Sequence, residues 1–436
     1  MFIALGVLLG LVSLCPAILI VGGTFLPCLI PLLVATGLIL IALNLPPIEA
    51  QRFGKLIQPL VICAAIPALW MLAQMLPLPL SHTAPWAILS SLAHPVWASV
   101  ATGFTSNIAG SVSIDIGATA TALVRYLSIV GVILLATSVT INRDRAEAVL
   151  VGLTAATVLI SFVLIGADAF DAGPLAAPEE ALNCACLGLI FSATCAWLIF
   201  ERQETRRSKL GLRETRFVYS MLACLAAFLV CAGAIAATRS GSLIFAASCG
   251  FGMFCAVFLV RRLNLGRWGA GAIGVTASVI AIALVSGAAG HSADLRLAFV
   301  KKDPASIELT QRILADTPFL GDGAGTFGSL LPIYRSTSDG AREGDAVTAS
   351  ARLSVEMGRP VLWAAVIAAI ISVIYFLRAA AKRGRDSFYP ASAASCLVTL
   401  IILAFVNVGL FGAALPALSA VILGLGLAQS QSRIQA

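Results

Sequence analysis

Apolar segments follow one another along most of this chain, and short polar connections separate them. A helix of about 20 apolar residues crosses the roughly 30 Å hydrocarbon core of a bilayer. Because the bilayer offers no water to peptide groups, each such segment is expected to be helical. The pattern predicts about twelve spans. They are expected at roughly 2–21, 24–44, 57–77, 120–140, 147–166, 181–200, 217–236, 241–260, 268–289, 360–377, 390–409 and 411–428.

One long polar interval, 290–359, interrupts the pattern between the ninth and tenth expected spans. Asp303 followed by Pro304 is typical of an N-cap and a first helical residue, so a helix is predicted from there to about Asp316. Pro318 ends it, because proline cannot continue a helix. The loop is therefore expected to be partly helical.

The fold class that follows is an all-α polytopic membrane protein. Its expected parts are spans 1–9 in 1–289, the long loop in 290–359, and spans 10–12 with a tail in 360–436. Composition agrees, since 59% of the residues are hydrophobic and only 11% are charged. Such a chain cannot hide its apolar surface in a water-soluble globule.

The formal charge of +7 is explained by topology. Every even connection is basic, and the odd connections other than the long interval 290–359 carry almost no Lys or Arg. The basic positions are Arg52, Lys55, Arg143, Arg145, Arg202, Arg206, Arg207, Lys209, Arg213, Arg216, Arg261, Arg262, Arg267, Arg378, Lys382, Arg383, Arg385 and Arg433. By the positive-inside rule both termini are cytoplasmic, which places 290–359 outside, in the periplasm of a Gram-negative cell. Long loops escape the positive-inside rule, so the basic residues of 290–359 do not contradict the assignment. No nucleic-acid partner is expected.

The second outside interval, 78–119, contains prolines that disfavour a continuous span. An interfacial or re-entrant helix with Trp86 and Trp97 at headgroup depth fits better. His82 and His94 lie here without a nearby carboxylate or cysteine in the sequence. We therefore interpret both histidines as facing the interface and assign neither to a site.

Eleven cysteines lie in apolar segments, without a CxxC pair and without a member in the long loop. They are interpreted as small apolar packing residues. We expect neither a disulfide framework nor a metal site, and no cofactor.

Two arginines outside the long loop are candidates for chemistry. Arg125 lies inside the fourth expected span, where a charge faces a cavity or snorkels to the outer interface. Arg239 lies in a short outside turn just before a helix begins, beside the positive end of that helix. Arg239 is predicted to bind a diphosphate, and the alternative is again a snorkelling arginine.

Within the long loop, the glycine-rich sequence GDGAG (321–325) is interpreted as tight turns, because neither a preceding strand nor a Gly-Lys-Ser/Thr sequence accompanies it. Arg312 and Arg335 are candidates for binding anionic groups, since the guanidinium fork binds two oxygens and keeps its charge. Glu343 and Asp345 are candidates for accepting a proton from a sugar hydroxyl. A solvated loop of mixed charge is the alternative.

Several stretches resemble one family when read in order: QMLPLPLSH, SVSIDIGATA, TRSGSL, SIELTQRILADTPFLGDGAGTFGSLLPIY and SVEMGRPVLW. Together they are similar to the bacterial O-antigen ligase and polysaccharide polymerase superfamily. The resemblance covers most of the chain. It implies a metal-independent, glycosyltransferase-like enzyme of the inner membrane that uses an undecaprenyl-diphosphate-linked glycan as donor. The donor diphosphate would be held by Arg239, with Arg312, Arg335 and Arg125 as further candidates.

The chain differs from this family where a His-Asn pair is common, shortly before a Glu-x-Gly motif. That motif is Glu356 and Gly358 here, and the preceding stretch reads Asp345-Ala346-Val347-Thr348. A transfer from a lipid diphosphate needs the leaving group stabilised and the acceptor hydroxyl deprotonated. Without the histidine, Asp345 or Glu343 would accept the proton, or the acceptor would lose its proton late, to solvent.

The sequence therefore favours a surface polysaccharide polymerase, whose partners would be the lipid-linked glycan, membrane lipid and a chain-length regulator. An O-antigen ligase acting on lipid A-core is the first alternative. A transporter of lipid-linked glycan or solute is another, although no internal repeat is evident. A non-catalytic assembly subunit is the last.

Overall fold

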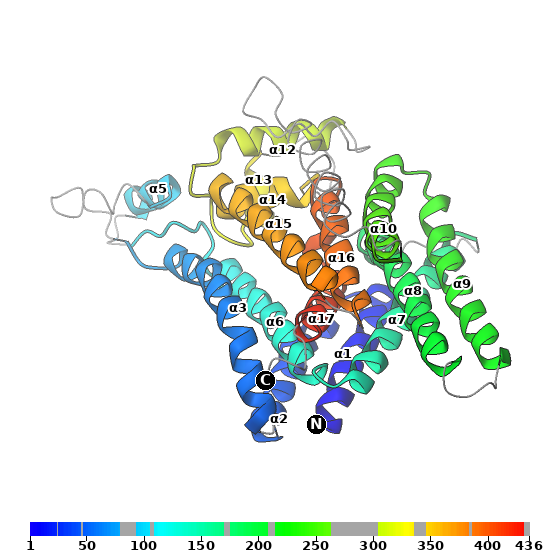
Figure 1. The fold of residues 1–436 in the computed structure, drawn as a ribbon. Helices are drawn as coiled ribbons and strands as arrows, with labels where there is room; N and C mark the ends of the chain where they lie inside the picture. Colours follow the sequence, from blue (N-terminus) through cyan, green and yellow to red (C-terminus); the bar gives the residue numbers. More distant parts are fainter. Residues whose placement is uncertain are drawn as a thin grey trace. The chain divides into compact units, whose positions relative to one another are not determined.

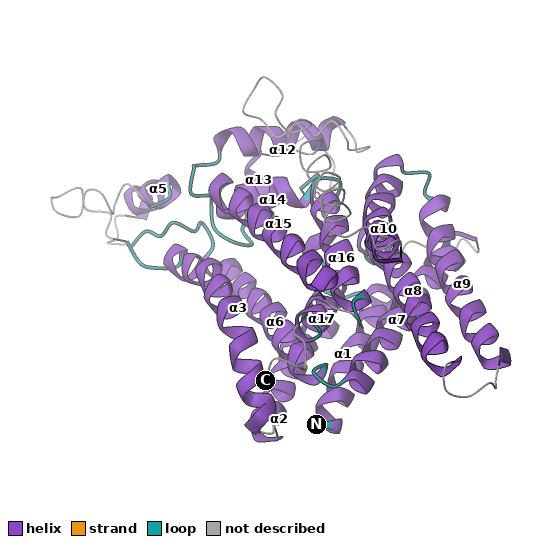
Figure 2. Cartoon of the chain, in the orientation of Figure 1, coloured by secondary structure: helices purple, strands orange, loops and turns teal. Residues whose placement is uncertain are grey.

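The structure, a computed structural model, describes residues 1–23, 25–44, 47–78, 93–104, 109–169, 175–207, 214–262, 304–334, 346–382 and 386–430. Within these ranges every regular secondary-structure element is a helix (Figure 2). The only β-type pairing in them is one antiparallel bridge between Leu78 and Gly110. The prediction of an all-α protein is confirmed.

Nine of the described helices are long and apolar enough to cross a bilayer, as expected of a multi-pass membrane protein. They are α1 (Phe2–Val21), α2 (Phe25–Asn44), α3 (Pro47–Gln74), α6 (Ile116–Val139), α7 (Arg143–Ala169), α8 (Pro178–Arg207), α9 (Glu214–Ala237), α10 (Gly241–Arg262) and α15 (Arg359–Lys382). The predicted span at 268–289 lies outside the described residues.

The last two predicted spans correspond to shorter helices, α16 (Phe388–Ala404) and α17 (Ala414–Ala428). Between them the chain makes a short 3-10 turn, η1 (Gly409–Phe411). The eleventh predicted span therefore ends earlier than 409, because backbone groups of this connection bond to side chains of another helix. The backbone N–H of Val408 donates to Glu179 Oε2 at 3.4 Å, and Glu180 Oε1 accepts from the first two N–H groups of α17.

The chain forms two compact units. Unit 1 comprises Met1–Ile57, Ile129–Gly287 and Ala368–Ala436, and unit 2 comprises Gln58–Ser128 and Ala288–Ile367. Helices α3, α6 and α15 each contribute one part to each unit.

Unit 1 is built around α8, which packs against α7, α9, α10 and α16 (Figure 1). Its core contains many small side chains, which let helices approach closely in a bilayer where apolar burial gives no driving force. Trp197 of α8 fills the wider space beside α10 and meets Phe254 and Phe258 edge-on.

Charged side chains from three connections meet at one end of unit 1. Arg143 lies 3.4 Å from Glu147 and 3.0 Å from Asp386, and Arg202 pairs with the same Glu147. These residues come from the starts of α7 and α16 and the end of α8. All three connections were predicted to lie on the same side of the membrane, since each carries basic residues.

Unit 2 contains the short helices of the two polar intervals: α5 (Pro95–Phe104), α12 (Pro304–Asp316), α13 (Phe327–Tyr334) and α14 (Ala349–Met357). The predicted loop helix ending at Asp316 is confirmed as α12. In α14, Thr348 accepts the backbone N–H of Ala351 and so caps the helix. The intervals 78–119 and 290–359, both predicted to lie outside, are in direct contact in unit 2.

Candidate functional site

The glycine segment, defined here as residues 321–325, is the centre of unit 2. Its backbone bonds to two other parts of the unit. The N–H of Asp322 donates to Val355 O at 2.9 Å, and that of Gly323 donates to Glu356 O at 3.0 Å. On the opposite side, Ile114 N–H donates to Asp322 O at 3.0 Å. The segment is thus fixed between α14 and the residues that lead into α6.

Only glycine fits at three positions of this segment, Gly321, Gly323 and Gly325. Gly321 and Gly323 have φ values of +82° and +113°, a region that other L-residues rarely adopt. A Cβ on Gly321 would lie 2.6 Å from Gly358 N, and one on Gly323 would lie 2.4 Å from Ser113 Oγ. The prediction of tight-turn glycines agrees with this geometry, and close packing is a second reason for them.

Gln74, at the end of α3, connects a third element to the glycine segment. Its side chain is fully buried. Its Oε1 accepts the N–H of Ala324 at 3.1 Å, and its Nε2 donates to Glu356 O at 3.4 Å. Both ends of the amide are therefore used to hold the segment in place.

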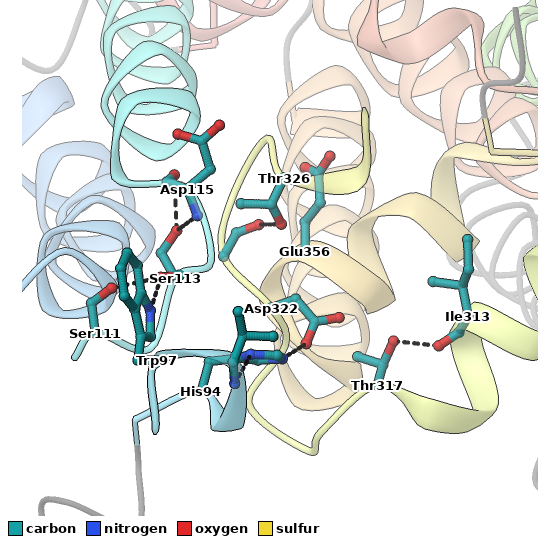
Figure 3. Close-up of polar contacts among 12 residues, drawn as sticks. His94, Trp97, Ser111, Ser113, Asp115, Ile313, Thr317, Asp322, Thr326 and Glu356 are labelled. Atoms are coloured by element: carbon teal, nitrogen blue, oxygen red, sulfur yellow. Dashed lines mark hydrogen bonds and ion pairs between the residues drawn. The ribbon is translucent and has the colours of Figure 1, made fainter. Parts of the chain in front are cut away.

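Asp322 points from the glycine segment toward His94, which directly precedes α5 (Figure 3). His94 Nε2 lies 3.3 Å from Asp322 Oδ1, and the two side chains are only 13% and 5% exposed. His94 Nδ1 in turn accepts the N–H of Val96 at 3.3 Å, in the first turn of α5. Trp97 in the same turn donates from Nε1 to Ser113 O at 3.0 Å. The histidine is thus held from two sides.

Asp115 connects the start of α6 to α13. Its Oδ1 accepts the N–H of Ala118 at 3.0 Å, and its Oδ2 accepts the hydroxyl of Ser329 at 3.1 Å. The hydrogen bond from Ala118 lowers the pKa of Asp115, partial burial opposes this, and Ser329 adds a smaller lowering. Asp115 is a structural connector between two helices.

Two further carboxylates of unit 2, Asp316 and Glu356, each have a partner. Tyr334 at the end of α13 hydrogen-bonds to Asp316, and burial, followed by this bond, raises the pKa of Tyr334. The charge of Asp322 also raises it, so Asp322 lies near this pair. Glu356 is engaged by Arg352, whose Nε donates to Oε1 at 2.8 Å.

The arginines predicted to bind a donor diphosphate are distributed between the two units. Arg312 of unit 2 is exposed and pairs with Glu308 at 2.5 Å, one helical turn away. Arg125 of unit 2 is exposed on α6. In the described part of the chain no hydrogen bond or ion pair connects these two arginines. Arg239 belongs to unit 1, where it is exposed in the turn between α9 and α10.

The remaining predicted site residues, Glu343, Asp345 and Arg335, lie outside the described residues. The stretch Asp345-Ala346-Val347-Thr348, compared above with the His-Asn pair of the family that the sequence resembles, is described from Ala346 onward. Ala346 and Val347 are fully buried there, and Val347 packs with Ala351 and Ile307. Among these described positions, none carries a group that exchanges protons.

His94 and Asp322 were not predicted as site residues. The sequence signal for them is weak, because Asp322 lies within a glycine turn and His94 has no carboxylate near it in the sequence. Within the described ranges, no three His, Cys, Asp or Glu side chains gather as metal ligands. The arrangement contains one buried carboxylate, that of Asp322, which is fixed through its backbone N–H and C=O and through Oδ1.

No protein-family model matches the chain, and no curated protein matches it.

Proposed function

We propose that this protein is a surface polysaccharide polymerase. It transfers an undecaprenyl-diphosphate-linked glycan to a glycan acceptor at the outer, periplasmic face of the bacterial inner membrane. The enzyme is glycosyltransferase-like, and the energy of the reaction comes from the sugar–diphosphate bond of the donor.

The observation that carries this proposal is the contact between the two long polar intervals in unit 2. A transfer between lipid-linked substrates needs polar groups at fixed positions, on a protein whose bulk lies in the bilayer. Unit 2 combines such groups, since Asp322, His94 and Gln74 are all held by hydrogen bonds. A solute transporter would instead be expected to place its polar groups near the middle of the spans.

Arg239 is the proposed anchor for the donor diphosphate. It is exposed, and the backbone of Ser240 and Gly241 leads directly into α10. The N-terminal N–H groups of a helix attract anions, and a neighbouring guanidinium adds a charged fork. Arg239 has a φ of +48°, which is a strained backbone value for any residue that carries a Cβ.

The test is glycan polymerisation by the purified protein in proteoliposomes that contain undecaprenyl-diphosphate-linked repeat units. The unchanged protein should give long chains on a gel, and Arg239→Ala should lose them because the donor is not held. Arg239→Lys should retain part of the activity. Arg378→Ala is the matched control, because Arg378 is an exposed arginine of the same unit in a connection predicted to lie on the opposite side.

Three outcomes would contradict the proposal or the part of it that concerns Arg239. Translocation of the lipid-linked glycan without any lengthening would indicate a transporter. Transfer only to added lipid A-core, without chain growth, would indicate a ligase. Equal chain lengths from Arg239→Ala and the unchanged protein would remove the proposed donor anchor.

A further inference from the structure

We infer that Asp322 accepts the proton of the acceptor hydroxyl and that His94 is its positioning residue. This inference rests on the proposed glycosyl transfer and deepens it. Asp345 and Glu343, which the sequence predicts for this task, lie outside the described residues, and Asp322 is a further carboxylate that the described part of unit 2 offers.

The hydrogen bonds of His94 determine where its ring proton lies. Nδ1 accepts the N–H of Val96, so its lone pair is used and it carries no proton. The proton is therefore on Nε2, which faces Asp322 Oδ1 at 3.3 Å. Both ring nitrogens are engaged, which leaves neither free to take a proton from a substrate. His94 thus acts on Asp322 and does not act as the base itself.

Asp322 has the features expected of a fixed proton acceptor. Its N–H and C=O are both bonded, to Val355 and Ile114. Its Oδ1 faces His94, which leaves Oδ2 as the oxygen that would meet the acceptor. A carboxylate that is 5% exposed is largely shielded from water, and electrostatic interactions are stronger there than in bulk solvent.

Among the described residues of unit 2, three other carboxylates already have partners. Glu356 is paired with Arg352, Asp115 is used by Ala118 and Ser329, and Asp316 bonds to Tyr334. Tyr334 also senses the charge of Asp322 and stays protonated over a wider pH range than free tyrosine, because its pKa is raised.

The acceptor hydroxyl oxygen forms a bond to the anomeric carbon of the donor sugar. The bond from that carbon to the diphosphate oxygen breaks, and its electron pair leaves with undecaprenyl diphosphate. The hydroxyl proton passes to Asp322 Oδ2 and is then released to water.

The experiment uses the full-length protein in proteoliposomes with lipid-linked repeat units, and measures kcat, the KM for the acceptor and the affinity for labelled donor. Asp322→Asn keeps the size of the side chain but removes the base, so kcat should fall by about 100-fold or more. Donor affinity should stay unchanged. Asp115→Asn is the matched control, and its kcat should remain close to that of the unchanged protein, because Asp115 only connects two helices.

His94 is tested by two substitutions. His94→Leu should lower kcat with little change in the acceptor KM. His94→Gln should restore much of it, because the glutamine amide can donate a hydrogen bond to Asp322 as the imidazole does. If His94 only filled space, the Gln and Leu variants, whose side chains are similar in size, would have similar kcat values.

An Asp322→Asn protein that is folded, with an unchanged unfolding temperature, and that keeps the rate of the unchanged protein would overturn the inference. If Asp322→Asn does not fold, the His94 pair decides, and equal rates for Gln and Leu overturn it. Failure of the proposed function is distinct, because the unchanged protein would then lengthen no glycan at all.

Discussion

Asn183 of α8 and Asn407, in the connection after α16, exchange two hydrogen bonds through their side-chain amides. The N···O distances are 2.8 and 2.9 Å, and 224 positions separate the two residues in the chain. Both side chains are buried. Asn407 Oδ1 also accepts the N–H of Gly409, so the pair holds the break between α16 and α17.

We expect Asn183→Ala and Asn407→Ala each to destabilise the protein, because each leaves a buried amide without its partner. The coupling energy between them should be about 0.6–2 kcal/mol, the range for hydrogen bonds between membrane helices. A double-mutant cycle on unfolding in mixed micelles measures it. Additive effects of the two substitutions would show that the amides do not stabilise each other.

Gly323→Ala should destabilise unit 2 by about 2 kcal/mol or more, from the strained φ and the contact with Ser113 together. The new Cβ would lie 2.4 Å from Ser113 Oγ at a φ of +113°. Thermal unfolding of the detergent-solubilised protein is the measurement. Because the substitution also moves Asp322, glycan transfer should decrease with it.

Gly328→Ala is the control for that substitution. Gly328 lies within α13, and a Cβ there would meet nothing within 4 Å. Alanine should stabilise the helix by about 0.5–1 kcal/mol, because glycine loses more conformational freedom on folding. Equal losses of stability at positions 323 and 328 would show that the close packing of the glycine segment does not matter.

The spans could be predicted because apolar length requires a helix in a bilayer, whatever that helix packs against. The same holds for α12, whose start is determined locally by Pro304 and whose end precedes Pro318. The end of α16 could not be predicted in this way. It depends on Glu179, Glu180 and Asn183, which satisfy backbone and amide groups far away in the chain.

The candidate site was predictable only in part. Arg239 and Arg312 are predicted site residues, and their role in binding the donor stays a prediction. His94 and Asp322 were missed because their relationship exists only after the two polar intervals fold against each other. A hydropathy pattern contains no information about that contact.

The stability of unit 2 should depend on pH through Asp115. The bond from Ala118 lowers its folded pKa, whereas an unfolded aspartate titrates near pH 4. The stabilising contribution is therefore present above about pH 4 and is lost as the pH falls through the lower, folded value. The unfolding temperature of Asp115→Asn should be lower than that of the unchanged protein at pH 7. The difference between the two should shrink in more acidic buffer. A difference that is constant with pH would show that the charge does not contribute.

Stability and activity should change in opposite directions at Arg239. A non-glycine residue in the left-handed region costs about 1–2 kcal/mol, and glycine avoids that cost. Since Arg239 has φ +48°, Arg239→Gly should raise the free energy of unfolding by about 1 kcal/mol. It should also abolish chain growth, because the guanidinium that is proposed to hold the diphosphate is gone. Unfolding in detergent and glycan length on a gel are the two measurements. Arg239→Lys, which keeps both the strain and the charge, should show neither the gain in stability nor the full loss of activity. A more stable Arg239→Gly protein that still makes long chains would place the donor anchor elsewhere.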